Sequence, residues 1–96
     1  MEIGFDPIKS EKNVRERGLS FERAIDFDFE SATFLLDDRH DYGEVRRIAI
    51  GYLDRRLHFL CFVERPDGIR IVSFRKANIR EGKKHGKPLT LNRSRR

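Results

Sequence analysis

Four cations follow the turn at Asp67-Gly68, and their types and spacing suit a polyanion site. All four lie within residues 69–80: Arg70, Arg75, Lys76 and Arg80. Two of them come where a strand-like run meets a helix start. Side chains at such element ends are held rigidly while their tips stay in solvent. Because nucleic acid is the commonest polyanion, the stretch indicates a nucleic-acid site.

The charge of the chain is divided unevenly between its two halves. Residues 1–44 carry 12 acids and 6 bases, whereas residues 45–96 carry 4 acids and 15 bases. A basic half beside an acidic half favours a single face for a polyanion. The alternative is that the basic residues are only solvated strand edges and a tail.

Metal catalysis finds little support in the residue pattern. The three histidines are not three or four residues apart, and no carboxylate pair joins them at ligand spacing. The single cysteine lies in an apolar run and cannot build a cysteine-based zinc site. The polar residues 37–41 could hold a metal loosely, although an exposed loop explains them as well. We therefore expect no metal and no cofactor.

Cations alone can promote RNA cleavage. The 2′-hydroxyl attacks the adjacent phosphate, and arginine or lysine stabilises the charge that develops there. A base and an acid complete the set. The candidates for charge stabilisation are Arg46, Arg70, Arg75, Lys76 and Arg80, and those for proton transfer are Glu44, His40 and His58. A solvated surface charge is the alternative for each arginine, and a satisfied, partly buried histidine is the alternative for His58.

Strand geometry limits which of these side chains share a site. Side chains two residues apart on a strand share a face, and neighbours point to opposite faces. Arg70 and Arg75 therefore point to opposite sides of the sheet unless a bulge intervenes.

The capping residues and the apolar pattern predict two short helices before a sheet. Asp6-Pro7 starts the first helix and Gly18 ends it. Ser20 caps the second helix, whose buried side includes Phe21, Ala24 and Ile25. From residue 32 the pattern becomes strand-like. Strands are expected at residues 1–5, 32–36, 45–52, 57–63 and 69–75.

Short connections join the last three strands, so they should form an antiparallel meander. The strand at residues 57–63 is apolar on both of its faces, so it should be central and covered on both sides. The fold class is therefore α+β. We expect one domain over residues 1–81 and a basic, flexible tail over residues 82–96, where glycines interrupt any helix.

The sequence offers no membrane signal. No window approaches the roughly 18 apolar residues that a membrane-spanning helix needs. The N-terminus lacks the basic-then-apolar pattern of a signal peptide. We expect a cytoplasmic protein with no membrane partner.

Three groups of residues follow the pattern of a known family. They are Phe5-Asp6-Pro7 with Lys9, Asn13, Gly18, Phe21 and Ala24; Glu44-Val45-Arg46 with Gly51; and residues 71–77 with Arg80-Glu81. Their order and spacing, from about residue 3 to residue 81, resemble the BrnT family of ribonuclease toxins from type II toxin–antitoxin modules. The chain differs from the family pattern at Arg17, where the family usually has histidine, and at Phe74, where the family usually has a small residue.

The resemblance implies a RelE-like fold, a curved antiparallel sheet with two helices packed on it before the strands and one short helix after them. It implies metal-independent endoribonuclease activity that inhibits translation and growth. It also implies a cognate BrnA-like antitoxin with a ribbon-helix-helix domain, and contact with operator DNA only through the antitoxin complex. The motif positions that carry over are Lys9, Glu44, Arg46, Ser73, Arg75 and Lys76.

The leading hypothesis is therefore an endoribonuclease toxin in which Arg46 and Arg75 clamp the phosphate. The expected catalytic residues are Glu44, Arg46, Arg75 and Lys76. The expected RNA-binding residues are Lys9, Arg17, Arg70, Ser73 and Arg80. The alternative is a catalytically weak or inactive toxin-derived module, disabled by Arg17 or by Phe74 shielding the site, that binds antitoxin or RNA without cleavage.

Overall fold

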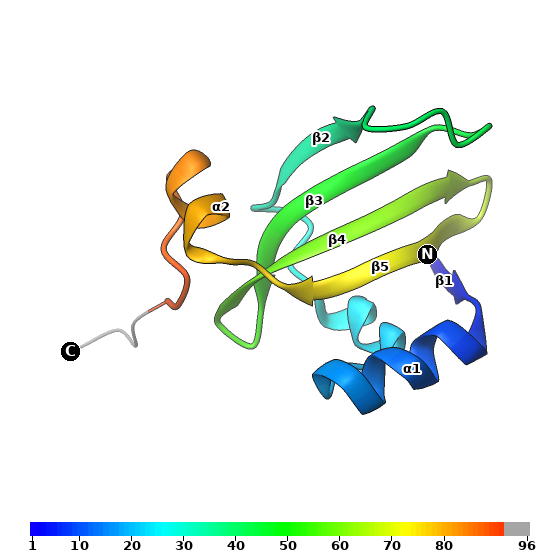
Figure 1. The fold of residues 1–96 in the computed structure, drawn as a ribbon, viewed down its shortest axis with the longest axis horizontal. Coiled ribbons are helices and arrows are strands. Elements are labelled where there is room, and N and C mark those ends of the chain that lie inside the picture. The colour runs from blue at the N-terminus through cyan, green and yellow to red at the C-terminus, as the bar shows by residue number, and fades with distance from the viewer. Residues whose placement is uncertain (92–96) are drawn as a thin grey trace.

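The computed structural model describes residues 1–91, which form one five-stranded sheet with helices before and after it (Figure 1). The elements are β1 (Glu2–Phe5), α1 (Pro7–Arg17), the 3₁₀ helix η1 (Phe21–Asp26), β2 (Thr33–Asp37), β3 (Arg46–Leu53), β4 (Arg56–Arg65), β5 (Gly68–Lys76) and α2 (Ile79–Lys84). Their order across the sheet is β1-β5-β4-β3-β2. The fold is α+β, as predicted.

The first helix forms where its capping residues predict it. The side chain of Asp6 accepts a hydrogen bond from the backbone N–H of Ile8 at 2.9 Å, and Gly18 ends the helix with φ of 67°. Ser10 is the only residue of α1 that is buried. The Asn13 side-chain amide of this helix donates to the carbonyl of Phe74 at 2.9 Å, beyond the part of β5 that pairs with β1.

The prediction of two N-terminal helices packed on the sheet is wrong. The segment after Ser20 is the short 3₁₀ helix η1, in which Ile25, expected on the buried side, is 62% exposed. The helix η1 contributes Phe21 and Ala24 to the apolar cluster on the sheet, whereas α1 contributes no residue to it. Its buried residues, Phe21, Ala24 and the flanking Phe27, recur every three residues. That interval matches the three residues per turn of a 3₁₀ helix, whereas an α-helix would turn the third side chain away.

The sheet is mixed rather than wholly antiparallel. The pairs β2·β3, β3·β4 and β4·β5 are antiparallel, as the meander prediction requires. However, β1 pairs with β5 in parallel, because α1 and η1 separate it from the meander. The prediction for the strand at residues 57–63 is confirmed, since it forms the buried part of the central strand β4.

Two apolar clusters cover opposite faces of the sheet. The cluster on the η1 face includes Phe21, Phe27, Leu60, Ile71 and Phe74. The other cluster includes Ile50, Leu57, Phe59, Cys61, Val63 and Val72. We call this second side the arginine face, because it carries Arg46, Arg70 and Arg75. The helix α2 and Leu89 cover one end of it.

A bulge in β5 decides which side chains reach the arginine face. Cys61 pairs with Ser73, but Phe62 pairs with Ile71, so Val72 is the extra residue. An extra residue reverses the alternation of side chains beyond it. Arg70 pairs with Val63 and Arg75 pairs with Phe59, which both belong to the arginine face. The two arginines therefore share one face. The alternation of side chains along a strand permits this only because the bulge intervenes between them.

The chain continues past the expected domain boundary at residue 81, which falls inside α2. Beyond α2 it returns to the start of β4. The N–H of Leu57 donates to the carbonyl of Leu89, and the N–H of Leu91 donates to that of Arg55, both at 2.8 Å. Of the predicted flexible tail, residues 92–96 lie outside the described residues. Among residues 1–91, no helix combines the length and the apolar composition needed to cross a membrane.

Candidate functional site

Two arginines of the arginine face share one carboxylate. Glu44 Oε2 accepts a hydrogen bond from Arg70 Nη2 at 2.8 Å and lies 3.6 Å from Arg46 Nε. The Arg46 guanidinium also lies over the Tyr42 ring, 3.8 Å from its centre. The hydrogen bond from Arg70 is the main reason that the pKa of Glu44 is lowered. A carboxylate with a lowered pKa is a weaker base, so this geometry suits Glu44 to holding arginines better than to accepting protons.

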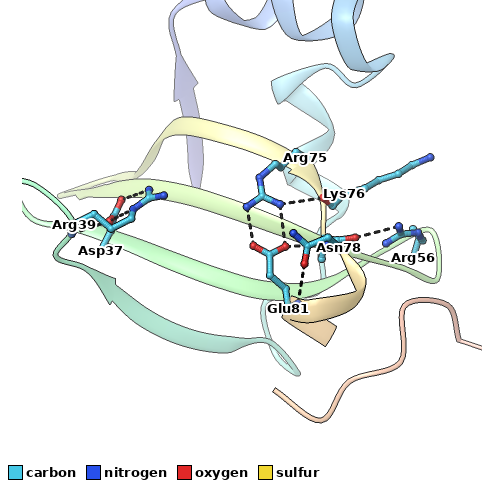
Figure 2. Close-up of polar contacts among 8 residues, drawn as sticks. Asp37, Arg39, Arg56, Arg75, Lys76, Asn78 and Glu81 are labelled. Atoms are coloured by element: carbon cyan, nitrogen blue, oxygen red, sulfur yellow. Dashed lines mark hydrogen bonds and ion pairs between the residues drawn. The ribbon is translucent and has the colours of Figure 1, made fainter. Parts of the chain in front are cut away.

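A second arginine site lies further along the same face. Arg75 donates from Nη1 and Nη2 to the two oxygens of Glu81, at 2.9 and 2.7 Å (Figure 2). Its guanidinium lies over the Phe59 ring at 4.1 Å. Such a bidentate, stacked arrangement fixes the plane of the guanidinium. Lys76 extends away from this pair, because it pairs with His58 on the η1 face.

The two arginine sites are separate in this structure. The strand partners of Arg70 and Arg75, Val63 and Phe59, are four residues apart on β4. At about 3.3 Å per residue the backbone separation is about 13 Å. Arg46 belongs to the Arg70 site, because both contact Glu44. Arg46 and Arg75 therefore hold different carboxylates, and the expected clamp of one phosphate by both stays a prediction.

Three predicted RNA-binding residues meet between α1 and β5. Lys9, Arg17 and Ser73 line a small groove of about 210 Å³. Arg80 is exposed on α2 and lines neither this groove nor the larger pocket described next. Phe74 is fully buried on the η1 face, so it does not shield Arg75.

A second pocket opens where β5 ends, and we call it the strand-end pocket. It has a volume of about 630 Å³. The end of α1, the β3–β4 turn and the last residues of β5 line it. Its charged side chains are Arg17, Arg23, Arg56, Arg75, Lys76 and Asp54. Five cations therefore face one acid, and that acid already accepts two hydrogen bonds from Arg23 at 3.0 and 2.9 Å.

His58 forms part of the wall of this pocket. The residue is 4% exposed, and its Nδ1 lies 2.7 Å from the carbonyl oxygen of Arg56. A carbonyl oxygen can only accept, so Nδ1 carries the proton. Burial lowers the pKa of His58, and the ring is therefore neutral near pH 7. Nε2 then carries a lone pair, and it has no hydrogen-bond partner among residues 1–91.

Sequence reasoning missed Glu81, Arg23 and Arg56. The signal for Glu81 was present, since Asn78 and Glu81 have the spacing of a capping box. Arg23 and Arg56 gave no local signal, because only the packing of η1 and the β3–β4 turn brings them to the pocket. Across residues 1–91, no three His, Cys, Asp or Glu side chains are grouped to hold a metal ion. Within the loop at residues 37–41, Asp37 is buried and pairs with Arg39 at 2.7 Å.

Comparison with protein-family models gives a match. A family model described as the ribonuclease toxin BrnT of type II toxin–antitoxin systems matches residues 5–81. None of the curated proteins matches the chain. The matched segment contains the whole sheet apart from the start of β1, both arginine sites and the residues that line the strand-end pocket.

Proposed function

Because the chain belongs to the BrnT family of ribonuclease toxins of type II toxin–antitoxin systems, we propose that it is a metal-independent endoribonuclease that inhibits translation in the cytoplasm. The observation that carries the proposal is the bulge at Val72, which brings Arg70, Ser73 and Arg75 to one face. The element order, with helices before and after a five-stranded sheet, supports a RelE-like fold.

Arg75 is the proposed stabiliser of the reacting phosphate. Its guanidinium has five N–H donors, and three hydrogen bonds use them, two to Glu81 and one to the carbonyl of Lys76. Two donors remain for phosphate oxygens. Because Glu81 and Phe59 hold the plane of the group, its charge needs little reorientation as the phosphorane forms.

The Arg46–Arg70 site is the proposed binding site for a neighbouring phosphate. The Nε atoms of both arginines are buried and have no hydrogen-bond partner among the described residues. A buried N–H donor without an acceptor costs free energy. Binding of an anion is therefore favoured if the arginines rearrange so that these donors reach its oxygens. RNA would then cross the arginine face from this site, past Ser73, to Arg75.

The proposed protein partner is a BrnA-like antitoxin with a ribbon-helix-helix domain. In the toxin–antitoxin complex, this domain would be the part that contacts operator DNA. An antitoxin segment on the arginine face would exclude RNA by occupying Arg70 and Arg75. The edge strand β2 offers a second contact, because Phe34 and Leu36 are 49% and 60% exposed. Unpaired strand edges with apolar side chains commonly accept a strand from a partner.

The test is cleavage of a mixed-sequence RNA by the purified chain in excess EDTA. Wild type should yield 2′,3′-cyclic phosphate ends, and Arg75→Ala should lose about two orders of magnitude in rate. Arg15→Ala is the matched control, since Arg15 lies on α1 and lines none of these sites. Intact RNA with folded wild-type protein would instead establish a module that binds without cleaving.

A further inference from the structure

The strand-end pocket is continuous with the arginine face. Arg75 and Lys76 are consecutive on β5 and point to opposite faces, yet both line the pocket because it surrounds the end of the strand. A chain whose phosphate sits at Arg75 therefore reaches the pocket with its next unit. The pocket also has the excess of cations that a second phosphate needs.

The uncharged part of the wall suits the nucleoside. Leu19 and Leu53 supply apolar surface, and no Phe, Tyr or Trp of residues 1–91 is among the lining residues. Arginine guanidinium planes can stack on bases in place of aromatic rings, and the exposed Arg17 is available for this. The volume of about 630 Å³ falls within the range of small-ligand sites.

His58 adds a polar group that the fold itself leaves unused. The carbonyl of Arg56 takes the Nδ1 proton, which leaves Nε2 as an acceptor in the pocket wall. In the described part of the chain, no cation that lines the pocket donates a hydrogen bond to this atom. A ligand with an O–H or N–H group satisfies Nε2, whereas a phosphodiester or sulfate anion, which carries no O–H group near pH 7, does not.

We propose that the strand-end pocket binds one ribonucleotide unit of RNA, the unit next to the phosphate at Arg75, with its own phosphate at Lys76 and a nucleoside O–H or N–H donating to His58 Nε2. This site deepens the proposed function, because it names a substrate subsite beside the arginine face. His58 acts here as a recognition group, and the pocket fixes which nucleotide neighbours the reacting phosphate.

The experiment uses the full chain with ¹⁵N-labelled histidine side chains. The four ribonucleoside 3′-monophosphates are titrated separately near pH 7, with inorganic sulfate, which carries no O–H group there, as the reference probe. At least one nucleotide should saturate and shift the Nε2 resonance of His58 while the resonances of His40 and His85 stay in place. Inorganic sulfate should leave Nε2 unshifted. Equal shifts with inorganic sulfate, or no shift with any nucleotide, would overturn the proposal.

A variant pair makes the same test by affinity. His58→Phe keeps a ring of similar size and removes the acceptor, so nucleotide binding should weaken about fivefold to tenfold. His40→Phe is the control, because His40 contacts Tyr42 outside the pocket. Unchanged affinity in folded His58→Phe would refute the site. The titration of wild type tests the site even if this variant does not fold.

RNA cleavage in EDTA separates the two proposals. Cleavage of RNA without any nucleotide-induced shift of the His58 Nε2 resonance would refute the pocket proposal and support the ribonuclease proposal. Nucleotide binding at His58 in a chain that leaves RNA intact would support the pocket and refute the activity.

Discussion

The Glu81 carboxylate ties Arg75 to the start of α2. It accepts hydrogen bonds from Arg75 at 2.9 and 2.7 Å, and its Oε1 also accepts from the backbone N–H of Asn78 at 2.9 Å. The orientation of the arginine and the capping of the helix therefore depend on the same group. Glu81 should act on RNA cleavage only through Arg75.

Replacing Glu81 by alanine should cost stability as well as activity. The variant loses the capping box and leaves Arg75 without its partner, so the free energy of unfolding should fall by about 1–2 kcal/mol. Urea unfolding measures this loss. Asn78→Ala is the matched control, since it removes the cap and keeps the ion pair. If Asn78→Ala impairs RNA cleavage as much as Glu81→Ala, the positioning role is refuted.

Acid should weaken the fold through the same carboxylate. The hydrogen bond from Arg75 is the main reason that the pKa of Glu81 lies below its ordinary value of 4.5. A lowered pKa in the folded state gives stability that is present above 4.5 and lost as pH falls through the folded value. The urea midpoint of wild type should therefore drop below pH 4.5. Glu81→Gln should show a smaller drop, and an identical pH profile would contradict this account.

The two arginine sites should contribute separately to RNA affinity. Each phosphate contact with a single strand contributes about 0.7 to the slope of log affinity against log salt. Arg70→Ala and Arg75→Ala should each reduce the slope by about that amount, and the double variant by about twice as much, because the sites are about 13 Å apart. Binding of a non-cleavable RNA at several salt concentrations measures the slopes. Arg15→Ala should leave the slope unchanged, and strongly non-additive losses would indicate one shared phosphate.

Gly51 should tolerate no side chain. A Cβ atom there would lie 2.8 Å from the Phe27 ring and 2.9 Å from Ala32 Cβ. Overpacking of this kind costs about 1–3 kcal/mol, so Gly51→Ala should lower the thermal midpoint by several degrees. Gly4→Ala is the control, because its nearest contact would be an ordinary 3.6 Å. Equal midpoints for the two variants would show that η1 can shift away from β3.

Local chemistry was enough to predict several elements. Asp6 and Gly18 bound α1 because capping depends on neighbouring backbone groups. A short connection between β3 and β4 was predicted, and its residues Asp54 and Arg55 both have positive φ. The strand at residues 57–63 was placed at the centre of the sheet because apolar side chains on both of its faces must both be covered.

Long-range packing decided the rest. The sequence after Ser20 fits both a 3₁₀ and an α-helix, and packing against the sheet selects the former. The bulge at Val72 depends on how β5 pairs with β4, and no residue near it signals the shift. The strand-end pocket gathers side chains from α1, the β3–β4 turn and β5, which are far apart in the chain. Charge and residue type thus indicated a nucleic-acid site, whereas the register between two strands determined which cations share one face.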